Sequence, residues 1–230
     1  ASSFFNKIDP FDPRNFFQYS NNESAKWIIF QFSHILKNDP NNVSMTIGLA
    51  DARYYVNQFD EALNLYVKAL TLEIDPSQAA HCYCARALIS KKTRAKDDDA
   101  SEEISLYQEA LKKDPDHMLS LVNLTGCLQS VGKYVDARIL FERLFQQDRS
   151  DEPHYHIALG NFGNNVGIID KDFTREAEMH LEAIKYCPEK DVDALTRHRL
   201  NAVRSLLCSN QIAEAKKRWS KWKTQLANPQ

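Results

Sequence analysis

The chain has 230 residues, of which 43% are hydrophobic and 26% are charged, as in an ordinary globular protein. Its 29 Lys and Arg residues nearly balance its 31 Asp and Glu residues, which argues against a surface that coats nucleic acid, because such a surface should be strongly basic. Only 6 Gly and 8 Pro interrupt the chain, so long helices are favoured over a meander of short strands. No apolar stretch approaches the length that a membrane-spanning helix needs.

Residues 1–42 are predicted to form an irregular N-terminal segment that ends in a capping helix. Pro10 and Pro13 stand close together, and each lacks a backbone donor and restricts the residue before it. This stretch therefore cannot be one continuous helix. Residues 27–42 carry an apolar pattern of helical spacing and are expected to form the second helix of a degenerate repeat.

The same segment is rich in phenylalanine. These side chains are too many to leave in water, and we expect them to cover the open end of the repeats, as a terminal cap must. The alternative is that they bind a partner. Phe16 and Phe17 are candidates for such an aromatic surface, together with Trp222 near the other end of the chain.

A signature of an aromatic residue, an alanine and a second bulky residue recurs along the chain. It is clearest in FDEALNLYVKAL (residues 59–70) and YVDARILFERL (residues 134–144). Spacings of three and four residues place the signature on one face of a helix. The second bulky position recurs at Tyr66, Tyr107, Phe141, Leu181 and Trp219. The separations of 41, 34, 40 and 38 residues fit a thirty-four-residue unit with loop insertions.

Another helical segment precedes each signature, so the unit is predicted to be an antiparallel pair of helices. The clearest first helix is residues 118–131, where Leu121, Leu124 and Leu128 form one apolar stripe. Gly132 ends this helix, and a short turn leads into the next one.

Two stretches depart from a simple repeat. Residues 90–103 hold basic residues followed by aspartates and are expected to be partly an exposed loop, with an electrostatic docking site as the alternative. Glu103 stands there in place of the alanine of the signature. Residues 163–173 (GNNVGIIDKDF) contain turn-forming residues and are expected to be a mobile loop on one edge of the array. Gly160, just before them, is expected to let a neighbouring helix approach closely.

These helix pairs resemble tetratricopeptide repeats. The shared features are Leu-Gly in a first helix, as at Leu159-Gly160, then Ala-x3-aromatic-x2-Ala in a second helix, and a closing Asp-Pro, as at Asp75-Pro76. Residues 118–151 match best, and the resemblance covers about four-fifths of the chain. It implies an all-α, right-handed superhelical solenoid of antiparallel helix pairs, with about five units over residues 43–222 and a tail over residues 223–230.

The resemblance also implies that the first helices of the pairs line a concave binding face. The residues expected to point from this face are Asp51, Tyr83, Arg86, Asn123, His154, Asn161, Asn201 and Arg204. Its three asparagines would form a row of amides, which can both donate to and accept from the backbone of an extended peptide of any sequence. The alternative is that these asparagines are merely solvated.

The function implied is a non-catalytic scaffold that binds a protein or an extended peptide and needs no cofactor. The alternative is a substrate-recruiting or regulatory domain of a larger enzyme or assembly. A clamp for the carboxylate tails of heat-shock chaperones is not expected, because residues 43–56 lack the lysine that such clamps use. Nucleic-acid binding is not expected either, since the basic residues near the C-terminus make only a local patch.

The sequence contains no motif of catalysis or of metal binding. The signatures of serine hydrolases, phosphate-binding loops and dinucleotide folds do not occur. Two local groups of possible metal ligands have the wrong spacing to hold one ion from a helix: His154 with His156, and His81 with Cys82 and Cys84. His117, His180 and His198 are isolated in the sequence and are expected at the surface or in the groove.

The five cysteines are odd in number and scattered, which indicates reduced thiols and a location in the cytoplasm or the nucleus.

Near the C-terminus, Trp219 and Trp222 share one helix face. We expect Trp219 to be buried and Trp222 to be partly exposed, because no further unit follows to cover it.

Overall fold

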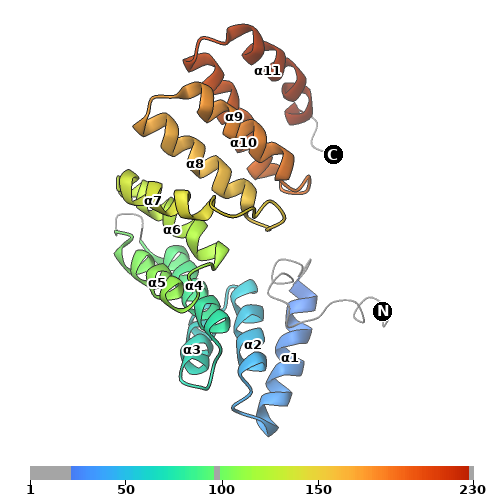
Figure 1. The fold of residues 1–230 in the computed structure, drawn as a ribbon. Helices are drawn as coiled ribbons and strands as arrows, with labels where there is room; N and C mark the ends of the chain where they lie inside the picture. Colours follow the sequence, from blue (N-terminus) through green and yellow to red (C-terminus); the bar gives the residue numbers. More distant parts are fainter. Residues whose placement is uncertain (1–21, 96–98, 228–230) are drawn as a thin grey trace. The chain divides into compact units, whose positions relative to one another are not determined.

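The computed structural model of the chain describes residues 22–95 and 99–227. Within these ranges the chain forms helices and no strand, which confirms the prediction of an all-α fold built from antiparallel helix pairs (Figure 1). None of the described helices is long and apolar enough to cross a membrane. Phe16 and Phe17 lie outside the described residues.

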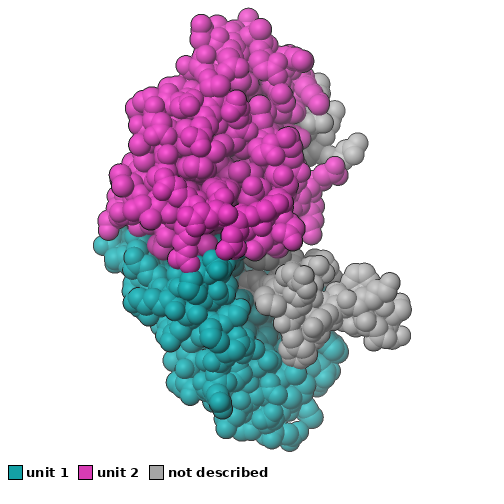
Figure 2. Space-filling view, in the orientation of Figure 1, with its two compact units in different colours: residues 1–120 teal, residues 121–230 magenta. Residues whose placement is uncertain are grey.

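The helices divide between two compact units, residues 1–120 and residues 121–230 (Figure 2). The helices that begin in unit 1 are α1 (Asn22–Asn38), α2 (Val43–Tyr55), α3 (Phe59–Leu70), α4 (Pro76–Thr93), α5 (Ser101–Lys113) and α6 (Met118–Ser130), the last of which continues into unit 2. The remaining helices of unit 2 are α7 (Tyr134–Leu144), α8 (Tyr155–Ile169), α9 (Phe173–Tyr186), α10 (Val192–Cys208) and α11 (Ile212–Ala227).

The core of unit 1 lies between α2, α3 and α4. Ala62, Tyr66 and Ala69 of α3, which belong to the repeat signature, are fully buried. They belong to one apolar cluster with Ile47 of α2 and Cys82 of α4. The recurring aromatic and alanine positions are therefore the face on which a second helix packs against its neighbours.

The Asp-Pro sequence that closes one repeat also begins the next helix. The Asp75 carboxylate accepts the backbone N–H of Gln78 at 2.9 Å, and Pro76 is the first residue of α4. Proline suits this position because its fixed φ is helical and the N–H that it lacks would have no partner within the helix. In unit 2, Asp172 and Asp191 cap α9 and α10 in the same way.

The core of unit 2 repeats this arrangement. Ala137, Phe141 and Leu144 of α7 have no exposed surface. The ring of Phe141 stacks on Phe162 of α8, with ring centroids 5.2 Å apart. The second helix of one pair thus contacts the first helix of the next.

The structure corrects the loop predicted over residues 163–173. α8 continues through most of this stretch, and only a short turn separates it from α9. Asn165, which the prediction placed in the loop, is fully buried; its amide donates to the carbonyl oxygen of Tyr134 at 2.9 Å and accepts from Arg138 at 2.7 Å. Residues that favour turns remain helical here because contacts with α7 satisfy their polar groups.

Glu103 is also buried, although its carboxylate replaces an alanine of the signature. Its side chain is 1% exposed, and the Arg94 Nε donates to one of its oxygens at 2.6 Å. An unpaired carboxylate would be costly in this position, so the ion pair explains how the repeat accepts it. Between α4 and α5, the Asp99 carboxylate accepts the backbone N–H of Ser101 at 2.9 Å.

The two C-terminal tryptophans have the reverse of the predicted exposure. Trp222 is 5% exposed and Trp219 is 41% exposed. No further repeat is needed to cover Trp222, because it lies beside α9 residues in a groove and its ring is 5.9 Å from the guanidinium carbon of Arg199 on α10. Trp222 is therefore core, and its assignment to an exposed aromatic surface was wrong.

Candidate partner-binding site

The residues predicted to bind a partner lie on or directly before the first helices of the pairs. In unit 1, Asp51 is on α2, and Tyr83 and Arg86 are on α4. In unit 2, Asn123 is on α6, His154 directly precedes α8, Asn161 is on α8, and Asn201 and Arg204 are on α10. All are partly buried except Arg204, which is exposed.

Asp51 serves an internal contact that the sequence did not reveal. Its Oδ1 accepts the hydroxyl of buried Tyr66 at 2.5 Å and lies 2.9 Å from Nε2 of His81. Burial alone would lower the pKa of His81, but the adjacent Asp51 carboxylate outweighs it and the pKa is raised. For Tyr66, burial and then Asp51 raise the pKa of the phenol. Asp51 thus joins α2, α3 and α4.

Tyr83 and Arg86 form one surface on α4. The guanidinium carbon of Arg86 lies 5.6 Å from the centroid of the Tyr83 ring, within the range of a cation–π contact. The Arg86 Nε is buried and has no hydrogen-bond partner among the described residues. A guanidinium held over an aromatic ring can bind a carboxylate or another planar acceptor.

Asn161 lies at the seam between α6 and α8. Its backbone carbonyl accepts the side-chain amide of Gln129 at 2.9 Å. Its own amide nitrogen would be 3.7 Å from a Cβ placed on Gly126 of α6. Asn123 is three residues before Gly126 and therefore shares that face of α6. The structure thus places Asn161 at the seam, and Asn123 lies on the same face of α6 as Gly126. Asn201 is on α10, where its carbonyl oxygen accepts the Ser205 hydroxyl at 2.8 Å.

Neighbouring groups shift the pKa of His154 and form an ion pair with Arg204. Burial and then the neighbouring His156 lower the pKa of His154 to about 4, so its imidazole is neutral near pH 7. Arg204 is ion-paired with Glu176 of α9, a carboxylate that is itself buried, and lies 3.5 Å from the side-chain oxygen of Asn164. Arg204 therefore neutralises a buried charge, while the rest of its exposed guanidinium faces solvent.

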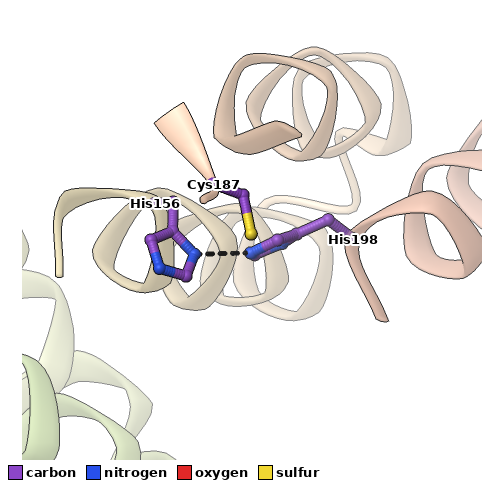
Figure 3. A group of neighbouring side chains, drawn as sticks. All are labelled: His156, Cys187 and His198. Atoms are coloured by element: carbon purple, nitrogen blue, oxygen red, sulfur yellow. Dashed lines mark hydrogen bonds between the residues drawn. The ribbon is translucent and has the colours of Figure 1, made fainter. Parts of the chain in front are cut away.

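Three histidines that are distant in sequence meet in unit 2. His156 of α8, His180 of α9 and His198 of α10 are all buried, so the surface positions predicted for His180 and His198 were wrong. Burial lowers the pKa of His180 to about 3 and that of His198 to about 4. Cys187 lies beside His156 and His198 (Figure 3).

Glycine in α8 makes this cluster possible. A Cβ on Gly160 would lie only 2.5 Å from Cε1 of His198, so a larger residue would displace the ring. This confirms the close approach expected at Gly160. Gly163 and Gly167 lie on the same side of α8, where Met179 and Glu176 of α9 approach them. The spacing of these glycines was the signal that bulky side chains converge here.

Comparison with known families agrees with the repeat architecture. Models of the tetratricopeptide repeat match residues 46–80 and residues 95–161. This chain carries tetratricopeptide repeats. Each match falls on helix pairs that the signature predicted.

Curated relatives share the repeats over part of their length. The chain is 31% identical over 101 residues, or 42% of its length, to the DnaJ protein P58IPK homolog of Arabidopsis thaliana, and covers 21% of that protein. It is also 31% identical over 107 residues, or 44% of its length, to the DnaJ protein P58IPK homolog B of Oryza sativa subsp. japonica, and covers 23% of it. The match therefore spans less than a quarter of either relative.

Solved structures share the fold. BtubC (BKLC) from P. vanneervenii has a TM-score of 0.66 at 20% identity, with 91% of this chain and 93% of that chain covered. YrrB, a tetratricopeptide-repeat protein described as having an unusual peptide-binding site, has a TM-score of 0.51 at 15% identity, with 76% and 83% covered. At these identities the likeness shows the fold alone.

Proposed function

We propose that this chain is a non-catalytic interaction module whose tetratricopeptide repeats hold an extended peptide or a partner protein along the first helices. The architecture supports an interaction scaffold, because stacked helix pairs leave one face of every first helix available to a ligand. The proposed peptide site lies on α6, α8 and α10 of unit 2. It needs no cofactor.

The observation that carries the proposal is the position of Asn161. Asn161 is only partly buried at the seam of two first helices, and Asn123 lies on the same face of α6 as Gly126. An extended peptide presents unpaired N–H and C=O groups at regular intervals, and amide side chains satisfy both kinds. Amides would therefore bind the peptide backbone, while Tyr83 with Arg86 in unit 1 would favour a partner that carries a carboxylate.

A second role is compatible with the same surface. The curated relatives extend well beyond the part that this chain matches. This supports the alternative that the repeats recruit a substrate, or regulate activity, within a larger protein or assembly. The proposed location is the cytoplasm or the nucleus, and five cysteines that form no disulfide are compatible with such a reducing compartment.

The test begins with a peptide selected on the immobilised wild-type chain from a random library. Its affinity is then measured by calorimetry for Asn123→Ala, Asn161→Ala and the double variant. Each single change is expected to weaken binding by about 1–3 kcal/mol, because a desolvated peptide group loses its partner. Asn64→Ala is the matched control, since Asn64 is exposed on the second helix α3.

Unchanged affinity in the double variant would refute the groove proposal. Loss of binding in Phe16→Ala/Phe17→Ala, with the asparagine variants unaffected, would assign the function to the N-terminal aromatic segment instead. The thermal unfolding of every variant is measured as well. A variant that binds weakly but melts like the wild type has lost a contact with the peptide and not its fold.

A further inference from the structure

The histidines and the cysteine of unit 2 have an arrangement that a hydrogen-bond network explains only in part. Nδ1 of His156 lies 3.3 Å from Nε2 of His198, and the rings meet at 82°. The ligand atoms of His156, His198 and Cys187 all lie within 4.8 Å of one another. The three side chains come from α8, the end of α9 and α10, and they point toward one another (Figure 3).

We propose that His156, Cys187 and His198 form a binding site for one zinc-like divalent transition-metal ion. Zinc takes imidazole nitrogens at about 2.0–2.1 Å and a thiolate at about 2.3 Å with tetrahedral geometry. Tetrahedral angles then place two ligating nitrogens about 3.3 Å apart, close to the separation of the two histidines. The same geometry separates sulfur from nitrogen by about 3.6 Å. Because the Cys187 sulfur lies within 4.8 Å of both nitrogens, it would need to move by no more than about 1.2 Å.

The surroundings supply what such a site needs outside its ligands. The other ring nitrogen of His198, Nδ1, lies 3.5 Å from Nδ1 of His180, whose Nε2 lies 3.2 Å from the side-chain oxygen of Asn164. A chain of donors and acceptors of this kind orients a ligating imidazole and fixes its tautomer. His180 is thus a positioning residue and Asn164 anchors it.

Charge and access are also compatible with a cation. On His156, Asp191, the cap of α10, favours positive charge more than Arg197 opposes it. On His198, Arg197 opposes positive charge more than Asp191 favours it. Cys187 directly follows α9 and is itself followed by exposed residues, so the site lies near the surface at this end. Binding would form two metal–nitrogen bonds and one metal–sulfur bond, release the Cys187 thiol proton to water, and leave a fourth position for a water molecule.

The test titrates Co²⁺ into the reduced, tag-free chain. One Co²⁺ per chain is expected, with a sulfur-to-cobalt charge-transfer band and the strong visible bands of tetrahedral cobalt, and Zn²⁺ should displace it. Cys187→Ser should abolish the charge-transfer band, whereas Cys208→Ser should not, because Cys208 is exposed at the end of α10. His156→Asn and His198→Asn should lose binding, whereas the exposed His34→Asn should retain it.

His180→Asn separates positioning from ligation: it should keep the band and weaken binding about 10–100-fold. Circular dichroism in chelator establishes that each variant folds, and Cys187→Ser decides the matter if a histidine variant does not. Absence of the charge-transfer band in the wild type, or its persistence in Cys187→Ser, would show that the cluster is only a buried hydrogen-bond network.

Discussion

Single side chains fix the contacts between helices of unit 1. Asp51 accepts the Tyr66 hydroxyl at 2.5 Å and lies 2.9 Å from His81, so one carboxylate serves three helices. A protonated His81 gains this partner only in the folded state. The network therefore links the stability of unit 1 to the protonation of one imidazole.

The raised pKa of His81 predicts a stability change above its ordinary value of 6.5. The folded state holds the proton more tightly than the unfolded state, so the stabilisation is complete below pH 6.5 and is lost as the pH rises through the folded pKa. Urea unfolding at rising pH should show this decline in the wild type and not in His81→Gln. The exposed His34→Asn should behave like the wild type; a decline that survives in His81→Gln would contradict the assignment.

Ala137 tests the packing of a signature position. It is fully buried on α7, so Ala137→Leu should overpack the site and cost about 1–3 kcal/mol of the free energy of unfolding. Ile139→Leu on the same helix is the control, because Ile139 is 60% exposed and its change should fall within about 0.5 kcal/mol. Equal unfolding midpoints for the two variants would mean that the position does not contact another helix.

Helix α8 differs from an ordinary first helix because its neighbours approach its backbone. Gly160→Ala should destabilise unit 2 by about 1–3 kcal/mol, since the new Cβ would meet the His198 ring at 2.5 Å. Gly126→Ala on α6 is the matched control. There the nearest atom would be 3.7 Å away, and alanine should be neutral or stabilise by up to about 1 kcal/mol through its higher helix propensity. Thermal melts of the two variants should therefore shift in different directions or by clearly different amounts.

The helix pairs were predictable from the sequence because their signal is local. Spacings of three and four residues define one helix face, and Asp-Pro marks the boundary between repeats, so α3 and α7 were located closely. The turn predicted over residues 163–173 was wrong because local preference for turns was overcome by tertiary contacts, among them the hydrogen bonds of buried Asn165.

The candidate sites were predictable only in part for the same reason. The first-helix positions followed from the repeat, and Asn161 lies at the seam between α6 and α8. The cluster of His156, Cys187 and His198 could not be predicted from the repeat. Its members are far apart in sequence and meet only when three elements pack. The role of Asp51 likewise depends on Tyr66 and His81, whose directions a sequence does not give.

At the scale of the whole molecule, the two units are built from helix pairs of the same kind. Each has a buried signature face on its second helices and partly exposed polar residues on its first helices. Stacked repeats of this kind present an extended surface along several helices. We propose that a peptide lies along the first helices.

The most direct measurement is photo-crosslinking of the selected peptide, with a photoreactive residue at successive positions, followed by mass spectrometry of the linked chain. We expect crosslinks on the first helices α6, α8 and α10, and their loss in Asn123→Ala/Asn161→Ala. Crosslinks confined to the second helices α7 and α9, or to residues 1–21, would contradict it.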